Sequence, residues 1–364
     1  MVAVVDRHRK RRERVQAAVR RLKLDALLIS DTSNVRYVSG FTGDSSWLLV
    51  GAAGVPVLIT DGRFVDQARA ECAGCRIYER KLSLVDTCRE LVSISRWRRV
   101  GVESDAVSYG AWKGLQGGDA TWEGTAGVVE GLRAVKDREE VDAIRAAIAV
   151  AERAFLMVRG IVRPGMREID VSNELECVMR HLGAAGESFG TIVLFGERSL
   201  LPHGQPGQRV LQPGELVLID WGARLGLYNS DLTRMLLPGT IGRKLERVYR
   251  VVLEAQQAAI GAARPGMLCE ELDEVARRLI RKAGLGKFFR HGVGHGVGMD
   301  IHECPRVTAG SKTALRQGMV ITVEPGVYVP GWGGIRIEDM VLITRSGGEV
   351  LTSLAKGMEE ARMQ

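Results

Sequence analysis

Four acidic residues and one histidine have the types and spacing of metal ligands. They are Asp220, Asp231, His295, Glu324 and Glu338. The acids end stretches that otherwise have the apolar pattern of buried strands. Burying such carboxylates is unfavourable unless positive charge joins them, and a pair of divalent cations would supply that charge. The sequence therefore predicts a metal centre made from these five side chains.

The first two acids are spaced as a cross-strand pair. If Leu225 and Gly226 form a two-residue hairpin turn, Asp220 and Asp231 lie directly opposite each other across the ladder. Directly opposed Cβ atoms are about 5 Å apart, which suits two carboxylates that share one ion. A solvated position at the end of a strand is the alternative interpretation for any single acid.

The other two acids are spaced in the same way. Glu324 and Glu338 are centred on Gly331, inside the segment PGWGG, whose residues tolerate unusual backbone angles. Two hairpins with the same arrangement of acids argue against chance placement at strand ends. We therefore expect a second cross-strand pair of carboxylates.

The two hairpins belong to a longer internal repeat. The letters RPGM occur at residues 163–166 and again 101 positions later, each time after a long helical pattern. Gly214 matches Gly318 at an offset of 104. The first acids of the two hairpins share that offset, and the second acids are 107 positions apart. Matches in the same order at nearly constant spacing indicate a duplicated unit of helix, helix and acid-bearing hairpin, with a metal site on the pseudo-twofold axis between the copies.

The elements around the repeat suggest two domains. Residues 1 to about 132 alternate an amphipathic helix and strand-like runs, which predicts a small α/β domain. A boundary is expected at residues 134–137, where Asp137 and Glu140 form a predicted capping box. Apolar residues then recur on one face of a helix that ends at Gly160, and a similar helix opens the second copy at Leu245.

Composition narrows the class of protein. With 364 residues, 45% of them hydrophobic, the chain can bury a large core. The formal charge of +7 is concentrated in residues 7–14, and no aromatic residues are interleaved there for base stacking, so we expect neither a nucleic-acid nor a membrane partner. Six sparse cysteines predict free thiols and a reducing compartment. With no apolar signal-peptide core, we expect a cytoplasmic protein.

These motifs resemble the pita-bread metallopeptidases, which include methionine aminopeptidase, aminopeptidase P and prolidase. The resemblance runs from about residue 135 to the end, through the blocks VLIDWGA, NSDLTR, HGVGHGVG, VEPGVY and IRIED. Upstream, SNVRYVSGFTG and LITDGRFVDQA resemble the extra domain of aminopeptidase P, prolidase and creatinase. The resemblance implies an α/β creatinase-like domain at residues 1–134 and an α+β pita-bread domain with internal pseudo-twofold duplication at residues 135–364.

The resemblance also implies how the ligands are shared. Asp220 and Asp231 would hold one ion, His295 and Glu324 the other, and Asp231 and Glu338 would bridge the two. Oxygen-rich ligation with one imidazole favours Mn²⁺, with Co²⁺ or Zn²⁺ as alternatives. Glu324 is then the expected general base and later general acid.

Three further histidines and two arginines complete the expected site. By the resemblance, His203 and His302 act as catalytic donors to the negative intermediate and to the departing proline nitrogen, and His291 binds substrate. Arg306 could bind a substrate carboxylate, although an ordinary salt bridge would leave the same pattern. Arg336 lies two residues before Glu338, on the same strand face, and is expected to orient a ligand carboxylate.

The glycines around His295 predict a packing role. Gly292, Gly294, Gly296 and Gly298 alternate and do not give the GxGxxG pattern of a phosphate-binding loop. We therefore expect the backbone of this segment to pack closely against its neighbours beside the metals.

The expected function is hydrolysis of Xaa-Pro bonds at the amino terminus of peptides. A site for this bond must recognise the pyrrolidine ring by shape, because proline lacks the N–H that general peptidases bind. Dipeptides and longer proline-containing peptides both remain open as substrates. The alternatives are a creatinase-like hydrolase of a non-peptide C–N bond and a non-catalytic pita-bread binding module. The resemblance further implies a homodimer.

Overall fold

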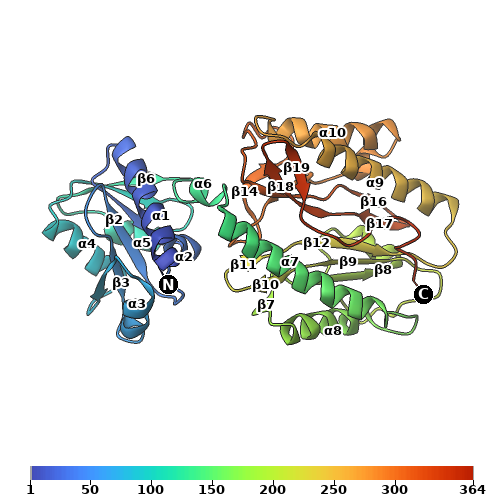
Figure 1. The fold of residues 1–364 in the computed structure, drawn as a ribbon, viewed down its shortest axis with the longest axis horizontal. Coiled ribbons are helices and arrows are strands. Elements are labelled where there is room, and N and C mark those ends of the chain that lie inside the picture. The colour runs from blue at the N-terminus through green and yellow to red at the C-terminus, as the bar shows by residue number, and fades with distance from the viewer. Residues whose placement is uncertain (1, 364) are drawn as a thin grey trace. The chain divides into compact units, whose positions relative to one another are not determined.

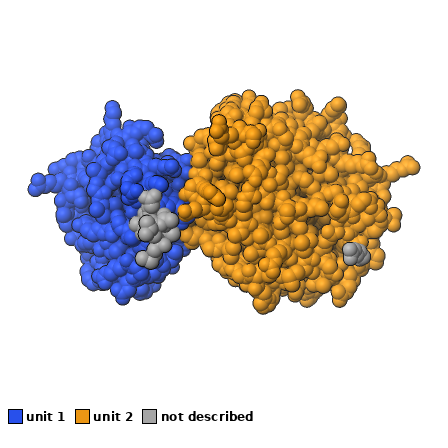
Figure 2. Space-filling view, in the orientation of Figure 1, with its two compact units in different colours: residues 1–133 blue, residues 134–364 orange. Residues whose placement is uncertain are grey.

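The computed structural model describes residues 2–363, and the chain divides into two compact units, residues 1–133 and 134–364 (Figure 2). Figure 1 shows the helices and strands of each unit. Within the described range, no helix combines the length and the apolar character that crossing a bilayer requires. All six cysteines are free, as the sequence predicted.

The first unit is an α/β domain built on one mixed sheet of six strands, in the order β4-β3-β2-β1-β5-β6. Strands β1, β2 and β3 pair antiparallel, and the flanking pairs are parallel. Its strands are β1 (Ala26–Ile29), β2 (Trp47–Gly51), β3 (Val57–Thr60), β4 (Arg76–Glu79), β5 (Arg99–Glu103) and β6 (Thr121–Thr125). Its helices are α1 (Val2–Arg21), α2 (Thr32–Ser39), α3 (Val65–Glu71), α4 (Leu84–Ile94), α5 (Tyr109–Leu115) and α6 (Glu130–Arg133).

The second unit contains two long helices, each followed by a shorter one and then by strands (Figure 1). The first half holds α7 (Arg138–Arg159), α8 (Glu168–His181), β7 (Gly186–Glu187), β8 (Ile192–Phe195), a 3-10 turn (Gly196–Leu200), β9 (Val217–Trp221), β10 (Ala223–Leu225), β11 (Tyr228–Asn229) and β12 (Leu232–Leu236). The second half holds α9 (Arg243–Ala262), α10 (Cys269–Lys282), a 3-10 turn (Gly286–Phe288), β13 (Gly294–Gly296), β14 (Glu303–Val307), β15 (Val320–Val323), β16 (Gly326–Val329), β17 (Gly333–Arg336), β18 (Asp339–Thr344) and β19 (Gly347–Val350).

The long helices form as the sequence predicted. The side chain of Asp137 accepts from the backbone of Glu140 while the Glu140 carboxylate accepts from the backbone of Asp137, so the predicted capping box is confirmed. The apolar stripe of α7 is buried, and one of its members, Phe155, stacks on Trp221 of β9 with ring centroids 4.5 Å apart. The helices therefore cover the strands that carry the acids.

The internal repeat extends to individual hydrogen bonds. In the first copy, Gly165 donates its N–H to the carbonyl of Leu211 at 3.0 Å; in the second, Gly266 donates to Leu315 at 2.8 Å. Both glycines have positive φ, 96° and 87°. The bond from Leu211 to the carbonyl of Met166 likewise matches the bond from Leu315 to Met267. Helix α8 and helix α10, each of 14 residues, follow these turns, so the predicted duplication is present in the fold.

The register of the first hairpin differs from the prediction. Asp220 pairs with Thr233, and Leu225 pairs with Tyr228, so the turn residues are Gly226 and Leu227. Gly226 has φ of 59°, as a turn with glycine in its first central position requires. The expectation that Asp220 faces Asp231 directly was therefore wrong by two positions. A shift of two keeps a side chain on the same face of the sheet, so the two carboxylates still meet, on a diagonal.

The register of the second hairpin agrees with the prediction. Val323 pairs with Asp339, and Gly326 pairs with Arg336, with the turn centred on Gly331. Glu324 and Glu338 lie between these two sets of pairs, at matching positions of the two chain segments. The two acids of this hairpin therefore lie opposite each other, and Glu338 lies beside the diagonal pair of the first hairpin.

Candidate metal centre

Three carboxylates of the two hairpins meet at one point. Ligand oxygens of Asp220, Asp231 and Glu338 lie within 4.8 Å of one another, and all three residues are buried. The first two come from the β9–β12 hairpin and the third directly precedes β18, so neither hairpin alone builds the cluster. Such a set of hard oxygen donors is suited to a divalent cation.

Burial and mutual repulsion act strongly on these acids. Removal from water raises the pKa of Asp231 well above its ordinary value, and the charges of Glu338 and Asp220 raise it further. Burial also raises the pKa of Glu338 well above its ordinary value, with the charges of Glu324 and Asp220 adding to the effect. In the absence of a cation, these groups therefore keep their protons to higher pH than ordinary carboxyl groups do, and a cation that binds them competes with those protons.

The histidine and the fourth acid extend the cluster on one side. Nε2 of His295 lies 3.5 Å from Oδ2 of Asp231 and 3.3 Å from Oε1 of Glu324. Burial alone would lower the pKa of His295, but its hydrogen bond to Glu324 and the charge of that residue raise it. Burial alone would raise the pKa of Glu324, yet the hydrogen bond and charge of His295 lower it to about 2. The five residues chosen from the sequence thus form one continuous group.

Arg336 binds directly to one of these acids. Its guanidinium, 2% exposed, donates from Nη2 to Oδ2 of Asp220, from Nε to Oγ1 of Thr233 at 3.1 Å and from Nη1 to Oη of Tyr328 at 2.8 Å. Thr233 in turn donates to Oε2 of Glu338 at 2.7 Å. One arginine of the second hairpin therefore orients a carboxylate of the first, and a threonine of the first orients a carboxylate of the second.

The donor set leaves room for a cation. Oδ1 of Asp220 is buried and accepts no hydrogen bond from any residue in the described part of the chain, while Oδ2 is held by Arg336. A buried carboxylate oxygen without a partner is unfavourable. This arrangement suits a carboxylate that binds a metal ion through Oδ1 while the hydrogen bond to Oδ2 fixes its orientation. We conclude that the residues present suit divalent metal ions.

The other predicted histidines lie around this group in different ways. His302 is exposed, and its ring centroid lies 4.4 Å from that of His295. His203 is also exposed, and it lies near enough that its charge lowers the pKa of Asp220 in opposition to burial. Arg306 is exposed and pairs in register with His295 across β13 and β14. All three side chains are exposed, and the charges of His203 and Arg306 both act to lower the pKa of His302, so the three lie near one another.

His291 lies differently, because both of its ring nitrogens have partners within the protein. Nδ1 lies 2.7 Å from the carbonyl of Gly292, and Nε2 lies 2.9 Å from Oη of Tyr328. Since that hydroxyl already accepts from Arg336, its own hydrogen is directed to the imidazole. Burial lowers the pKa of His291, which suits a neutral ring accepting at Nε2.

The sequence reasoning missed Thr233 and Tyr328. Both lie beside quoted motif residues, in NSDLTR and VEPGVY, and Thr233 follows Asp231 by two positions, on the same face of the strand. That period-two relation had identified Arg336 from Glu338 and would also have identified Thr233. Tyr328 gave no such signal, because its contacts depend on Arg336 across the hairpin and on His291 in the loop before β13.

The alternating glycines pack as the sequence predicted. A Cβ on Gly294 would lie 2.1 Å from the carbonyl oxygen of Thr322, and one on Gly296 would lie 2.2 Å from that of Cys304. A Cβ on Gly292 would lie 2.7 Å from the carbonyl oxygen of Val307. Side chains at these positions would push β13 away from its neighbours. The glycines therefore let the strand bearing His295 lie close to β14 and β15.

Sequence models of two families match the chain. Residues 142–345 match "Metallopeptidase family M24", and residues 11–135 match "Creatinase/Prolidase N-terminal domain". The first match includes all five residues of the metal centre. An Xaa-Pro dipeptidase of Pyrococcus horikoshii is 35% identical over 332 residues, which cover 90% of this chain and 93% of the relative.

Solved structures show the same fold over more than nine tenths of the chain. An Xaa-Pro dipeptidase from Bacillus anthracis superposes with a TM-score of 0.93 at 36% identity, covering 96% of this chain and 99% of the other. An X-Pro aminopeptidase from Thermotoga maritima gives a TM-score of 0.85 at 36% identity, covering 93% and 99%. The creatinase-like domain followed by a pita-bread domain is thus the fold of this chain.

Proposed function

Because the chain belongs to metallopeptidase family M24 and carries a creatinase/prolidase N-terminal domain, we propose that it releases an amino-terminal residue from a following proline. The relatives above are named as an Xaa-Pro dipeptidase and an X-Pro aminopeptidase, which supports this choice of bond. The single observation that carries the proposal is the convergence of three buried acids from two hairpins, joined to His295 and Glu324.

Two divalent ions, most readily Mn²⁺, would occupy this centre. Asp220 and Asp231 would hold one ion, and His295 and Glu324 the other, with Asp231 and Glu338 bridging. Four carboxylates roughly neutralise two divalent charges, and one imidazole among oxygen ligands favours Mn²⁺ or Co²⁺ over a closed zinc site. When bound, the ions would lower the pKa of a water molecule and polarise the scissile carbonyl.

Glu324 is the group that would carry the proton. It is ionised at neutral pH, so it can accept a proton from the attacking water. Thr322 donates to its Oε1 at 3.2 Å and also accepts the backbone N–H of His295 at 3.0 Å, so one hydroxyl aligns both residues. Glu324 would then return the proton to the departing proline nitrogen.

The exposed residues would contact the peptide. His203 and His302 stand on the open side of the centre and can donate hydrogen bonds to the developing negative charge of the carbonyl. Arg306, also exposed, would bind a carboxylate, which for a dipeptide is that of the proline itself. His291 would form part of the substrate-binding surface together with Tyr328, because both of its ring nitrogens already have partners within the protein.

The test is a peptide series assayed with the purified full chain. We expect Mn²⁺-loaded protein to cleave Ala-Pro or a longer Ala-Pro peptide, to lose activity in a chelator and to regain it when Mn²⁺ is restored. Ala-Ala serves as the matched peptide without proline. Failure on every Xaa-Pro length by protein shown to contain metal would contradict the proposal. A size measurement by light scattering tests the homodimer that we also propose.

Two alternatives make different predictions. A creatinase-like enzyme would hydrolyse creatine without metal, yet here the acids are buried together and their pKa values are raised, which favours a bound cation. A binding module would bind peptide without cleaving it and would hold no divalent ion after Mn²⁺ loading. Metal analysis combined with a creatine assay separates all three.

A further inference from the structure

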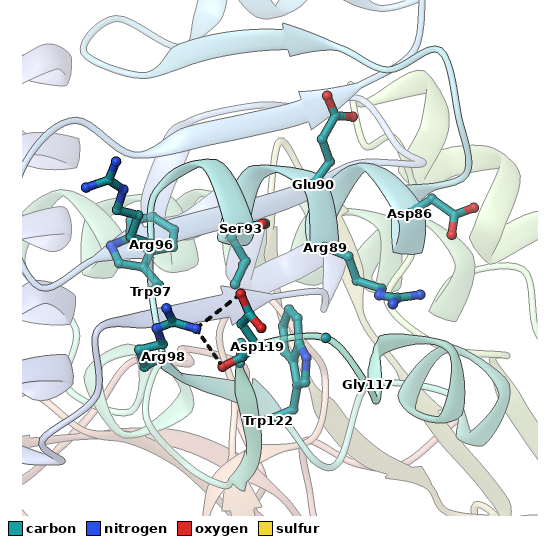
Figure 3. A pocket seen from close by; sticks show the side chains of 13 residues that line it. Asp86, Arg89, Glu90, Ser93, Arg96, Trp97, Arg98, Gly117, Asp119 and Trp122 are labelled. Carbon is teal, nitrogen blue, oxygen red and sulfur yellow. Dashed lines mark hydrogen bonds and ion pairs between the residues drawn. The ribbon is translucent and has the colours of Figure 1, made fainter.

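The first unit contains a pocket that the proposed peptidase reaction does not use. It has a volume of about 630 Å³, within the range of small-molecule sites, and lies between helix α4, the segment that follows it and the turn leading into β6 (Figure 3). Its lining includes the charged and aromatic side chains of Asp86, Arg89, Glu90, Arg98, Asp119 and Trp122.

Arg89 brings an exposed guanidinium to this pocket. Its guanidinium makes no hydrogen bond or ion pair with any side chain that the structure describes, and in Figure 3 it extends from α4 above the turn at Gly117. A Cβ on Gly117 would lie 3.9 Å from Nη2 of Arg89, and one on Gly118 would lie 4.0 Å away. Both glycines have positive φ, so the turn keeps the space around the guanidinium free of side chains.

Trp122 adds a second donor without an acceptor. Its side chain lines the pocket although the residue is only 6% exposed, and its indole Nε1 is buried with no hydrogen-bond partner in the described residues. Buried N–H groups normally have a partner. Figure 3 shows the ring standing beside Gly117, below Arg89. Two donors thus share one part of the pocket without an oxygen to receive them.

The acidic residues of the lining do not accept hydrogen bonds from Arg89 or Trp122 within the described chain. Asp119 pairs with Arg98 at 3.3 Å. Asp86, one helical turn before Arg89, accepts from Oγ of Ser83 at 2.6 Å, and no ion pair joins it to Arg89 among the described residues. Glu90 points to the opposite side of α4 from Arg89 and Trp122 (Figure 3). The part of the pocket around Arg89 therefore has an excess of donors.

We propose that this pocket binds a small oxyanion, a carboxylate or a phosphate, through the guanidinium of Arg89 and the indole N–H of Trp122. A guanidinium presents a planar fork of donors that matches such groups, and the indole would supply one further donor to the same anion. The proposal concerns the first unit alone and goes beyond the proposed peptidase activity.

The experiment titrates the full chain with benzoate or with inorganic phosphate and follows the indole N–H signals by ¹⁵N NMR. The chain has six tryptophans, and loss of one signal in Trp122→Phe identifies the relevant one. We expect that signal to shift with saturation by about 10 mM of at least one anion, as a site with a Kd of about 1 mM would show. The anion that saturates at the lower concentration identifies the source of the oxyanion.

Matched variants decide whether the response comes from this pocket. Arg89→Gln should weaken binding about tenfold, whereas Arg14→Gln, which removes an exposed arginine of α1, should leave it unchanged. Trp122→Phe should weaken binding too, measured by calorimetry. A Trp122 signal that moves with neither anion, or that moves equally in Arg89→Gln, would overturn the proposal. Peptide hydrolysis should be unchanged in every variant, so this test fails or succeeds independently of the proposed function.

Discussion

The guanidinium of Arg336 donates to the carboxylate of Asp220 although the two residues belong to different hairpins and are separated by 116 positions in the chain. The same arginine also donates to Thr233, which donates to Glu338. Two acids of the centre are thus fixed by residues of the opposite repeat. This exchange links the geometry of the metal centre to the packing of the two halves.

Arg336→Gln should therefore loosen the centre. The variant removes the charged donor from Asp220, and we expect about 10–100-fold weaker metal affinity, the usual effect of losing a group that orients a ligand. The measurement is the metal content that remains after dialysis against a graded chelator. Arg345→Gln, an exposed arginine of the same unit, is the matched control and should retain its metal. Equal retention in both variants would count against an orienting role.

Thr233→Val should weaken metal binding with little change of shape. The substitution removes the hydroxyl that donates to Glu338 at 2.7 Å and accepts from Arg336 at 3.1 Å. We expect about tenfold weaker metal affinity, measured by competition with a fluorescent chelator. Thr191→Val is the matched control, because that buried hydroxyl has no hydrogen-bond partner among the described residues. If the two variants bind metal alike, the hydroxyl of Thr233 does not orient Glu338.

Metal ions should stabilise the protein more at alkaline than at acid pH. Burial and like charges raise the pKa values of Asp231 and Glu338 in the metal-free protein. Groups with raised pKa stabilise the folded state below their unfolded pKa and lose that contribution as pH rises, while metal binding improves as their protons leave. The rise in Tm on adding Mn²⁺ should thus be larger at pH 8 than at pH 6. A gain independent of pH would contradict this linkage.

Glu103 should make the first unit sensitive to pH. Burial raises its pKa from 4.5 to about 7, in opposition to the hydrogen bonds from Asp31, Ser30 and Asn34. The stabilising contribution is complete below pH 4.5 and is lost as pH rises through about 7. The difference in unfolding free energy between the wild type and Glu103→Gln should change by about 3 kcal/mol across that window. Urea unfolding at several pH values measures it, and a constant difference would show an ordinary pKa.

Gly294→Ala should displace the strand that carries His295. The new Cβ would lie 2.1 Å from the carbonyl oxygen of Thr322, a backbone atom that cannot rotate away. We expect a loss of at least about 2 kcal/mol of stability, together with reduced metal content. Gly190→Ala, where a Cβ meets no atom within 4 Å, should change neither. Equal Tm values for the two variants would contradict the prediction, because they would show that β13 accommodates the added methyl group without loss of stability.

The errors of the sequence reasoning have a physical pattern. The first turn was placed with Gly226 second, whereas the structure uses it first, and the pairing moved by two positions. Side chains alternate between the two faces of a strand with a period of two. The prediction therefore gave the correct face for each acid but the wrong partner, because Asp220 lies across from Thr233. The choice of residues was therefore more robust than the prediction of contacts between them.

The sequence by itself determined the local features: the capping box at Asp137, the buried stripes of the long helices, the duplicated RPGM turns and the acids that end apolar strands. Each of these depends on residues near one another in the chain, whose periodicity and backbone preferences are visible in the letters. Only the tertiary structure decided that Arg336 reaches Asp220, that Thr233 holds Glu338 and that Tyr328 engages His291. The first two contacts join the two hairpins, and the third joins β16 to the loop before β13, so their partners are set by how segments distant in the chain pack.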